Sequence, residues 1–324
     1  MAINIVQFTH PGGQHSLNRI ERKNQLKEWN IGDHRRKFII AKGQYVDGGN
    51  LSSPQDLLFW GEWEPSSKIM ACFNPSDPIL YPTYLHSPFI QLDKRGRVVK
   101  HNSVLKAKSL KGKLNCVVPG CVNLYNQFQN TDPFVFAENF YYSCCKQVHF
   151  TSLRSLDEGS IILFGSTIST SRGRPAFALD TVFVVGEKRT YTSKTFKNDL
   201  SCFIPKYYDE IMGFKTWKTS TQFTCYKGAS FNNPLHGMYS FVPCMKDDKA
   251  TLVFSRVILT ENDFKSVSIP SLSKYKKNKS VITDNLNSAP KVIASDLNTN
   301  KQVWDTLCKI IDSQGYIQGV NFQY

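Results

Sequence analysis

The sequence predicts an α+β protein built mainly on curved antiparallel sheet, with a few helices that include one near the C-terminus. Short β-branched or aromatic runs recur along the chain, and Gly, Pro and Asn clusters separate them. The 324 residues are 41% hydrophobic and 13% aromatic, which is enough to fill a sizeable core. This length and composition indicate a globular protein of about two domains.

Strands are expected where apolar runs are short and rich in Val, Ile, Phe and Trp. The best candidates are residues 37–41, 57–60, 161–164, 177–185 and 251–254. Loops are expected at the Gly-, Pro- or Asn-rich stretches 48–50, 75–82 and 232–234.

The most convincing helix covers residues 301–313. Val303, Leu307 and Ile311 recur at helical spacing and form one apolar stripe. Asn300 is a plausible N-cap, and Gly315 is a plausible first residue beyond the C-terminus of the helix. Weaker helical patterns cover 16–29 and 139–156.

These elements suggest four segments along the chain. Residues 1–110 form an N-terminal β-rich region, and residues 111–265 form a central β-barrel region. Residues 266–290 are rich in Ser, Asn and Lys, so we expect an exposed polar loop there. Residues 291–324 supply a C-terminal helix and strand that pack on the core.

The net charge of +14 is the first functional clue, because a compact basic protein is attracted to polyanions such as DNA or RNA. Eight Lys and Arg residues lie between positions 94 and 113 with no acidic residue among them, and a second basic cluster covers 34–37. The alternative is a solvated basic face without a specific partner. We expect phosphate contacts from Arg35, Arg36, Lys37, Lys94, Arg95, Arg97 and Lys100.

Two segments combine aromatic rings with polar groups that suit base recognition. Residues 59–65 carry two Trp and two Glu around a Gly, and residues 126–134 are dense in Asn and Gln beside Phe. Aromatic faces stack on bases, while amides and carboxylates pair with base edges. Core packing and turn formation are the alternatives. The predicted base-binding residues are Trp60, Glu62, Trp63, Phe128, Gln129, Asn130 and Asp132.

The start of the chain lacks a basic region followed by an apolar run, and no stretch approaches the length of a membrane helix. Together with nine cysteines, an odd number, this predicts a cytoplasmic protein with free thiols and no membrane association. A zinc site at Cys116, Cys121, Cys144 and Cys145 is conceivable, but the spacing favours buried thiols. We therefore expect no metal and no cofactor.

One part of the chain resembles PUA-like barrels, the group that includes ASCH, EVE and YTH domains. The resemblance rests on Gly159-Ser-Ile-Ile-Leu-Phe-Gly-Ser166 followed by the apolar run Phe177 to Val185, and it covers residues 153–186. Ser160 stands where the family usually has Asp. The resemblance implies a barrel that binds RNA or modified bases, often through an aromatic cage, for which Trp60 and Trp63 become candidates.

The whole chain is also similar to an uncharacterised bacterial family that shares three motifs. These are Phe8-Thr-His-Pro-Gly12, His34-Arg-Arg-Lys-Phe38 and Trp60-Gly-Glu-Trp63. The similarity implies no established activity.

Catalysis stays an open alternative. Tyr226-Lys227-Gly228, Tyr239-Ser240-Phe241 and Glu261 loosely resemble the Arg, Ser, Glu order of NAD-dependent ADP-ribosyltransferases, although Lys227 replaces the Arg. Asp180, or His10 as a general base on a loop, would suit a nuclease-type effector. A protein-interaction module is the third reading. The sequence leaves open whether the protein is an enzyme and whether it oligomerises.

Overall fold

The computed structural model describes somewhat more than half of the chain. The described residues are 3–10, 36–62, 68–69, 90–92, 98–100, 117–118, 133–136, 138–169, 175–205, 208, 221–246, 256–267, 282 and 289–323.

The first sheet is mixed. Strand β1 (Asn4–Thr9) runs parallel to β10 (Ile161–Ser169) and antiparallel to β15 (Lys291–Ala294). Beyond β10, the antiparallel order continues through β11 (Pro175–Tyr191), β12 (Phe223–Gly228) and β9 (Tyr141–Tyr142), and β14 (Val257–Leu259) also pairs with β11. All six residues of β1 are buried, which fits a strand in the interior of a sheet.

The second sheet contains a closed antiparallel barrel of four strands. They are β2 (Arg36–Asp47), β4 (Gln55–Glu62), β13 (Val242–Lys246) and β16 (Ile317–Val320). Strand β16 pairs with both β13 and β2, which closes the ring. Strands β3 (Asn50–Leu51) and β8 (Val117–Val118) pair with β2, and β5 (Lys68–Ile69) pairs with β8. Strands β6 (Ile90–Leu92) and β7 (Val98–Lys100) pair with each other.

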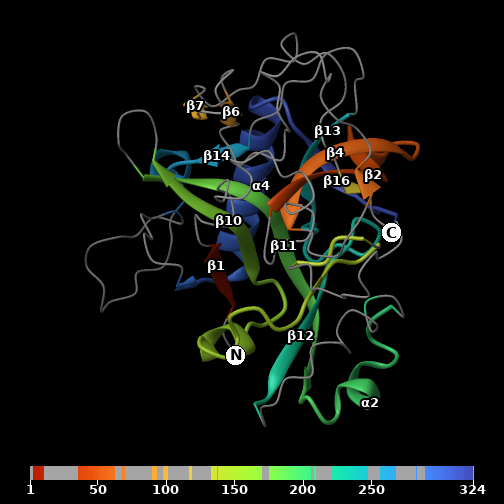
Figure 1. Ribbon diagram of the computed structural model, residues 1–324. Coiled ribbons are helices and arrows are strands. Elements are labelled where there is room, and N and C mark those ends of the chain that lie inside the picture. Colours follow the sequence, from red (N-terminus) through yellow and green to blue (C-terminus); the bar gives the residue numbers. More distant parts are fainter. Residues whose placement is uncertain are drawn as a thin grey trace.

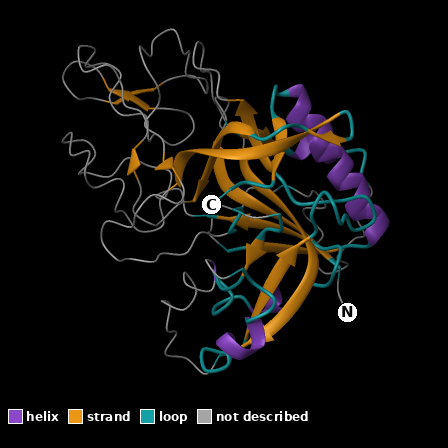
Figure 2. Ribbon diagram, turned by 90° about the vertical axis from the view of Figure 1, so that its right-hand side faces the viewer, coloured by secondary structure: helices purple, strands orange, loops and turns teal. Residues whose placement is uncertain are grey.

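The two sheets share one hydrophobic core. Val182 on β11 and Phe241 exchange backbone hydrogen bonds of 3.0 and 2.9 Å, and the chain then enters the barrel as β13. Helix α4 (Leu297–Ser313) runs along one side of the strands (Figure 2) and contacts β16. Its buried residues Val303, Trp304 and Leu307 belong to the same core, so both sheets and the helix pack as one unit.

The C-terminal helix begins earlier than expected. Asp296, not Asn300, is the N-cap, because its carboxylate accepts a hydrogen bond of 2.9 Å from the backbone N–H of Thr299. Asn300 instead lies buried in the first turn and donates to the carbonyl of Gly159 at 2.7 Å. Gly315 follows the helix with φ +81°, which confirms its predicted place.

The expected helix over 139–156 is largely absent. Only a short 3-10 helix, η4 (Thr151–Arg154), forms there. Lys146 adopts φ 61°, which an α-helix does not tolerate, and the Arg154 guanidinium binds the carbonyls of Gln147 and Val148 at 2.7 and 3.2 Å. Two further short helices are α2 (Phe196–Leu200) and η5 (Glu261–Phe264).

Most of the other expected elements in the described part are confirmed. The runs 37–41, 57–60, 161–164 and 177–185 lie in β2, β4, β10 and β11, and 48–50 and 232–234 lie at turns or bends. The predicted elements 16–29, 75–82 and 251–254, with most of 266–290, fall outside the described residues.

The strands of the four predicted segments are interleaved in space. Residues 1–110 supply β1 to the first sheet and β2 and β4 to the barrel, while residues 291–324 supply one strand to each. The closed barrel also uses different strands from those of residues 153–186, which carry the PUA-like resemblance and lie in the mixed sheet.

Candidate functional site

Most of the predicted nucleic-acid-binding residues lie outside the described part of the chain. These are Arg35, Trp63, Lys94, Arg95, Arg97, Phe128, Gln129, Asn130 and Asp132. Of the others, Lys100 ends β7. Arg36 pairs in register with Glu62, and Lys37 pairs with Gly61, at one end of the β2–β4 pair. The β2–β4 register therefore pairs one predicted phosphate-binding residue, Arg36, with one predicted base-binding residue, Glu62.

Trp60 lies in the barrel core. Its side chain is only 2% exposed, and it stands opposite Phe38 in the β2–β4 register. This burial favours the packing interpretation of Trp60, because a base cannot stack on a ring that the protein already covers. A base-reading role in segment 59–65 then depends on Glu62 and Trp63.

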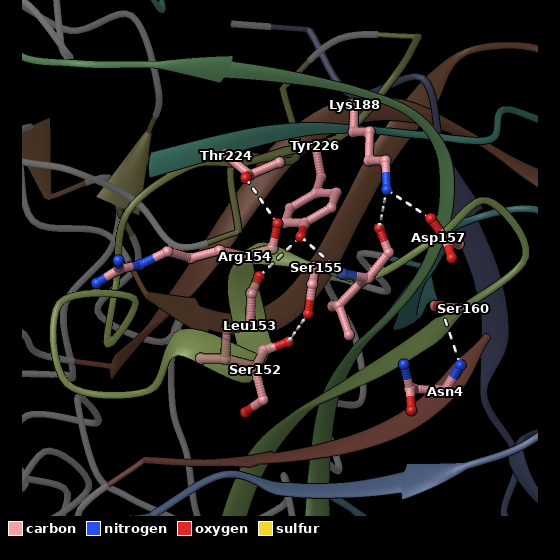
Figure 3. A network of polar contacts seen from close by, with 11 residues as sticks. Asn4, Ser152, Leu153, Arg154, Ser155, Asp157, Ser160, Lys188, Thr224 and Tyr226 are labelled. Atoms are coloured by element: carbon pink, nitrogen blue, oxygen red, sulfur yellow. Dashed lines mark hydrogen bonds and ion pairs between the residues drawn. The ribbon is translucent and has the colours of Figure 1, made fainter. Parts of the chain in front are cut away.

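The long β11–β12 ribbon is tied to the segment around η4 by a polar network (Figure 3). The hydroxyl of Tyr226 donates to the carbonyl of Leu153 at 2.8 Å and accepts from the N–H of Leu156 at 3.1 Å. Burial raises the pKa of Tyr226 well above its ordinary value. The neutral phenol already donates one hydrogen bond and accepts another, so it fixes η4 in place and does not serve as a base near neutral pH.

Lys188 and Gln147 complete this attachment. The Lys188 amine binds the carbonyl of Leu156 at 3.1 Å and the carboxylate of Asp157 at 2.5 Å (Figure 3). The amide of Gln147 donates to the carbonyl of Thr224 at 2.8 Å and accepts from its N–H at 2.9 Å. Gln147 thus satisfies the backbone of β12 at Thr224, where no strand of the described part of the chain pairs on that side.

Exposed cations gather at the far end of this ribbon, where β11 and β12 extend from the body beside α2 (Figure 1). They are Lys188, Arg189, Lys194 and Lys197, with Glu187 and Asp199 among them. The Arg189 guanidinium lies 5.2 Å from the centre of the Phe203 ring, and Lys227 pairs with Glu187 at 2.7 Å. The cluster does not stand out as a basic run in the sequence, because Glu187 and Asp199 lie among its cations.

Asp180 is a structural residue. It is 2% exposed, and the Nε of Arg256 donates to its carboxylate at 2.7 Å. Arg256 also donates to the hydroxyl of Ser166 at 2.7 Å and to the carbonyl of Ala178 at 2.8 Å. The pair lies where β11 carries one extra residue opposite β10, so it fastens β14 across an irregularity in the sheet. This corrects the interpretation of Asp180 as a nuclease carboxylate.

The sequence suggested that His10 lies on a solvated loop, but the structure buries it. Its side chain is 2% exposed, and its Nδ1 lies 3.3 Å from the carbonyl of Gly165. The imidazole packs 4.9 Å from the Phe8 ring, measured between ring centres. His10 therefore belongs to the core at the end of β1.

The described thiols are free. They are Cys144, Cys145, Cys202, Cys225, Cys244 and Cys308. Burial raises the pKa of Cys308 to about 12, and it raises the pKa of Cys244 still further, so both remain protonated at neutral pH. Within the described residues, no group of three or more His, Cys, Asp or Glu side chains could hold a metal ion. Cys116 and Cys121 of the conceivable zinc site lie outside them.

The residues that resemble an ADP-ribosyltransferase motif serve the fold. Tyr226 is the phenol of the polar network, Lys227 is paired with Glu187, and the N–H of Ser240 donates to the carbonyl of Ala229 at 2.8 Å. Glu261 opens the short helix η5. Lys227 would have to leave Glu187 before it could bind the phosphates of NAD.

No family model, curated protein or solved structure matches this chain. Among the helices in the described part of the chain, none is long and apolar enough to cross a membrane.

Proposed function

We propose that the protein binds nucleic acid and reads a modified or flipped base. The basic segments contact the phosphates, and side chains from segments 59–65 and 126–134 contact the base. Burial of Trp60 leaves Glu62, Trp63, Phe128, Gln129, Asn130 and Asp132 as the proposed base-binding set.

One observation carries this proposal. Eight cations and no acidic residue lie between positions 94 and 113, in a chain with a net charge of +14. Such a run attracts a phosphate backbone, and its binding releases counterions, so the affinity falls with salt. The β2–β4 register adds support, because Arg36 and Glu62, proposed as a phosphate contact and a base contact, are paired positions at one end of the two strands.

Charge reversal within the basic run tests the proposal. The variant Lys94→Glu/Arg95→Glu/Arg97→Glu is compared with wild type for binding to labelled single- and double-stranded DNA and RNA. We expect weaker binding and a salt dependence reduced by roughly one unit of log–log slope for each lost phosphate contact.

The control is Lys309→Glu, which reverses one exposed charge on α4. A small loss of affinity in the control together with a large loss in the triple variant supports a phosphate-binding run. Equal affinities for the triple variant and wild type would contradict the proposal.

A further inference from the structure

A rigid hairpin at residues 231–238 projects beside α4. Leu235 and Met238 exchange two backbone hydrogen bonds of 2.9 Å each, and the two residues between them, His236 and Gly237, have φ of 50° and 72°. Positive φ at both positions is the geometry of a tight two-residue turn. The N–H of Asn233 is also held, because it lies 3.2 Å from both the carbonyl and the hydroxyl of Ser230. The backbone of this 231–238 hairpin is therefore fixed.

Aromatic side chains beneath the hairpin join it to α4. Phe231 packs edge-on against Tyr239, with 5.3 Å between ring centres. The Trp304 indole N–H donates to the carbonyl of Tyr239 at 2.9 Å, and the Lys301 amine lies 5.3 Å from the centre of the Trp304 ring. A Cβ on Gly237 would lie 3.5 Å from Cε of Lys301, so the lysine stem lies under the turn. A cation is thus held close to the hairpin.

Most side chains on the outside of the hairpin are exposed, and two of the polar ones make no hydrogen bond within the described residues. Asn232, Asn233, Pro234 and His236 are exposed, and Phe231 is half-buried. Among the described residues, the side chains of Asn233 and His236 have no hydrogen-bond partner, whereas Asn232 donates to Glu138 at 3.1 Å. Glycine would occupy the left-handed position of His236 without steric cost, yet an imidazole stands there.

We propose that the 231–238 hairpin binds an unpaired base of a single-stranded nucleic acid. The Asn233 amide offers a donor and an acceptor to a base edge, and the His236 and Phe231 rings offer flat surfaces for stacking. The fixed backbone lowers the entropy lost on binding. The charges beside the hairpin do not favour a phosphate, because Asp305 pairs with Lys301 at 2.5 Å and Glu138 accepts a hydrogen bond from Asn232. The proposed contact is therefore to the base and not to the backbone of the strand. This inference rests on the proposed function and adds a second base contact to it.

The test compares His236→Gly and Asn233→Ala, alone and together, with wild type. Glycine keeps the turn at position 236, and the Asn233 side chain makes no internal hydrogen bond, so both variants should fold. Asn198→Ala, an exposed amide on α2, is the matched control. The probes are labelled single-stranded DNA and RNA of mixed sequence, and an abasic strand of the same length. Unchanged thermal unfolding establishes that each variant is folded.

We expect the double variant to bind the base-containing strands roughly tenfold more weakly, the control to bind like wild type, and the abasic strand to be bound equally by all. If wild type binds and the double variant matches it, the hairpin inference is wrong while the proposed function stands. An equal loss on the abasic strand would also overturn it, because the contact would then be to phosphate. Absence of binding by wild type would overturn the proposed function itself.

Discussion

At the residue scale, buried polar side chains hold the strands in register. Arg256 and Asp180 form an ion pair in which both side chains are 1% exposed. Removing one partner of such a pair leaves an uncompensated buried charge. The contacts of Arg256 with Ser166 and Ala178 also place the pair on the β10–β11 hairpin. This hairpin connects the interior strand β1 to the rest of the first sheet.

We therefore expect Asp180→Asn to lower the free energy of unfolding by about 3–5 kcal/mol. Glu187→Gln, which breaks the exposed pair with Lys227, should cost less than about 1 kcal/mol. Urea unfolding of both variants measures the difference. Equal shifts of the two midpoints would refute the structural role of Asp180.

Gly165 and Gly48 differ in the space that a side chain would find. A Cβ on Gly165 would lie 2.2 Å from the carbonyl oxygen of Ala178, whereas a Cβ on Gly48 would meet nothing within 4 Å although φ there is +55°. Gly165→Ala must displace the β11 backbone, so we expect a loss of about 3 kcal/mol. Gly48→Ala should cost about 1 kcal/mol, from its backbone conformation alone. Thermal unfolding that ranks Gly48→Ala as the more damaging change would contradict the packing at the β10–β11 hairpin.

At the element scale, α4 depends on its N-cap. Hydrogen bonds from the backbone N–H and the hydroxyl of Thr299 hold the pKa of Asp296 below its usual value. Because the folded pKa is lowered, the cap stabilises the protein above the unfolded pKa of about 3.9, and this contribution disappears as the pH falls through the folded pKa.

Asp296→Ala should therefore cost about 1 kcal/mol at neutral pH, and the difference from wild type should shrink in acid. Asp296→Asn keeps a capping oxygen at every pH, so its stability should lack that acid-dependent component. Chemical denaturation at neutral and acidic pH distinguishes the three proteins. A loss in Asp296→Ala that is the same at both pH values would disprove the assignment.

The sequence predicted elements well where local pattern decides them. The strand runs in β2, β4, β10 and β11 and the apolar stripe of α4 all rest on local periodicity. The errors came from tertiary contacts. The Asn300 side chain binds the carbonyl of Gly159, and Asp296 is the N-cap of α4. In 139–156, the positive φ of Lys146 and the contact of Arg154 with the carbonyl of Gln147 replace the predicted helix.

At the scale of the whole molecule, the topology could not be inferred from local pattern. Strands far apart in the sequence close the barrel, and β1 inserts between β10 and β15. The same limit applies to the candidate site. Composition and spacing identified the basic clusters, but burial of Trp60, His10 and Asp180 depends on contacts between distant segments. Of the 231–238 hairpin, the sequence predicts only a loop at 232–234, because the aromatic support of the hairpin comes from α4.

The most direct test of the central claim is a titration of labelled single- and double-stranded DNA and RNA at two salt concentrations, with a denaturing gel of the same samples. We expect tight binding that weakens with salt, retains a base-dependent part at the higher salt, and leaves the strands intact. Shortened or mass-shifted strands would indicate an enzyme in place of a reader. No binding at either salt concentration would contradict the account.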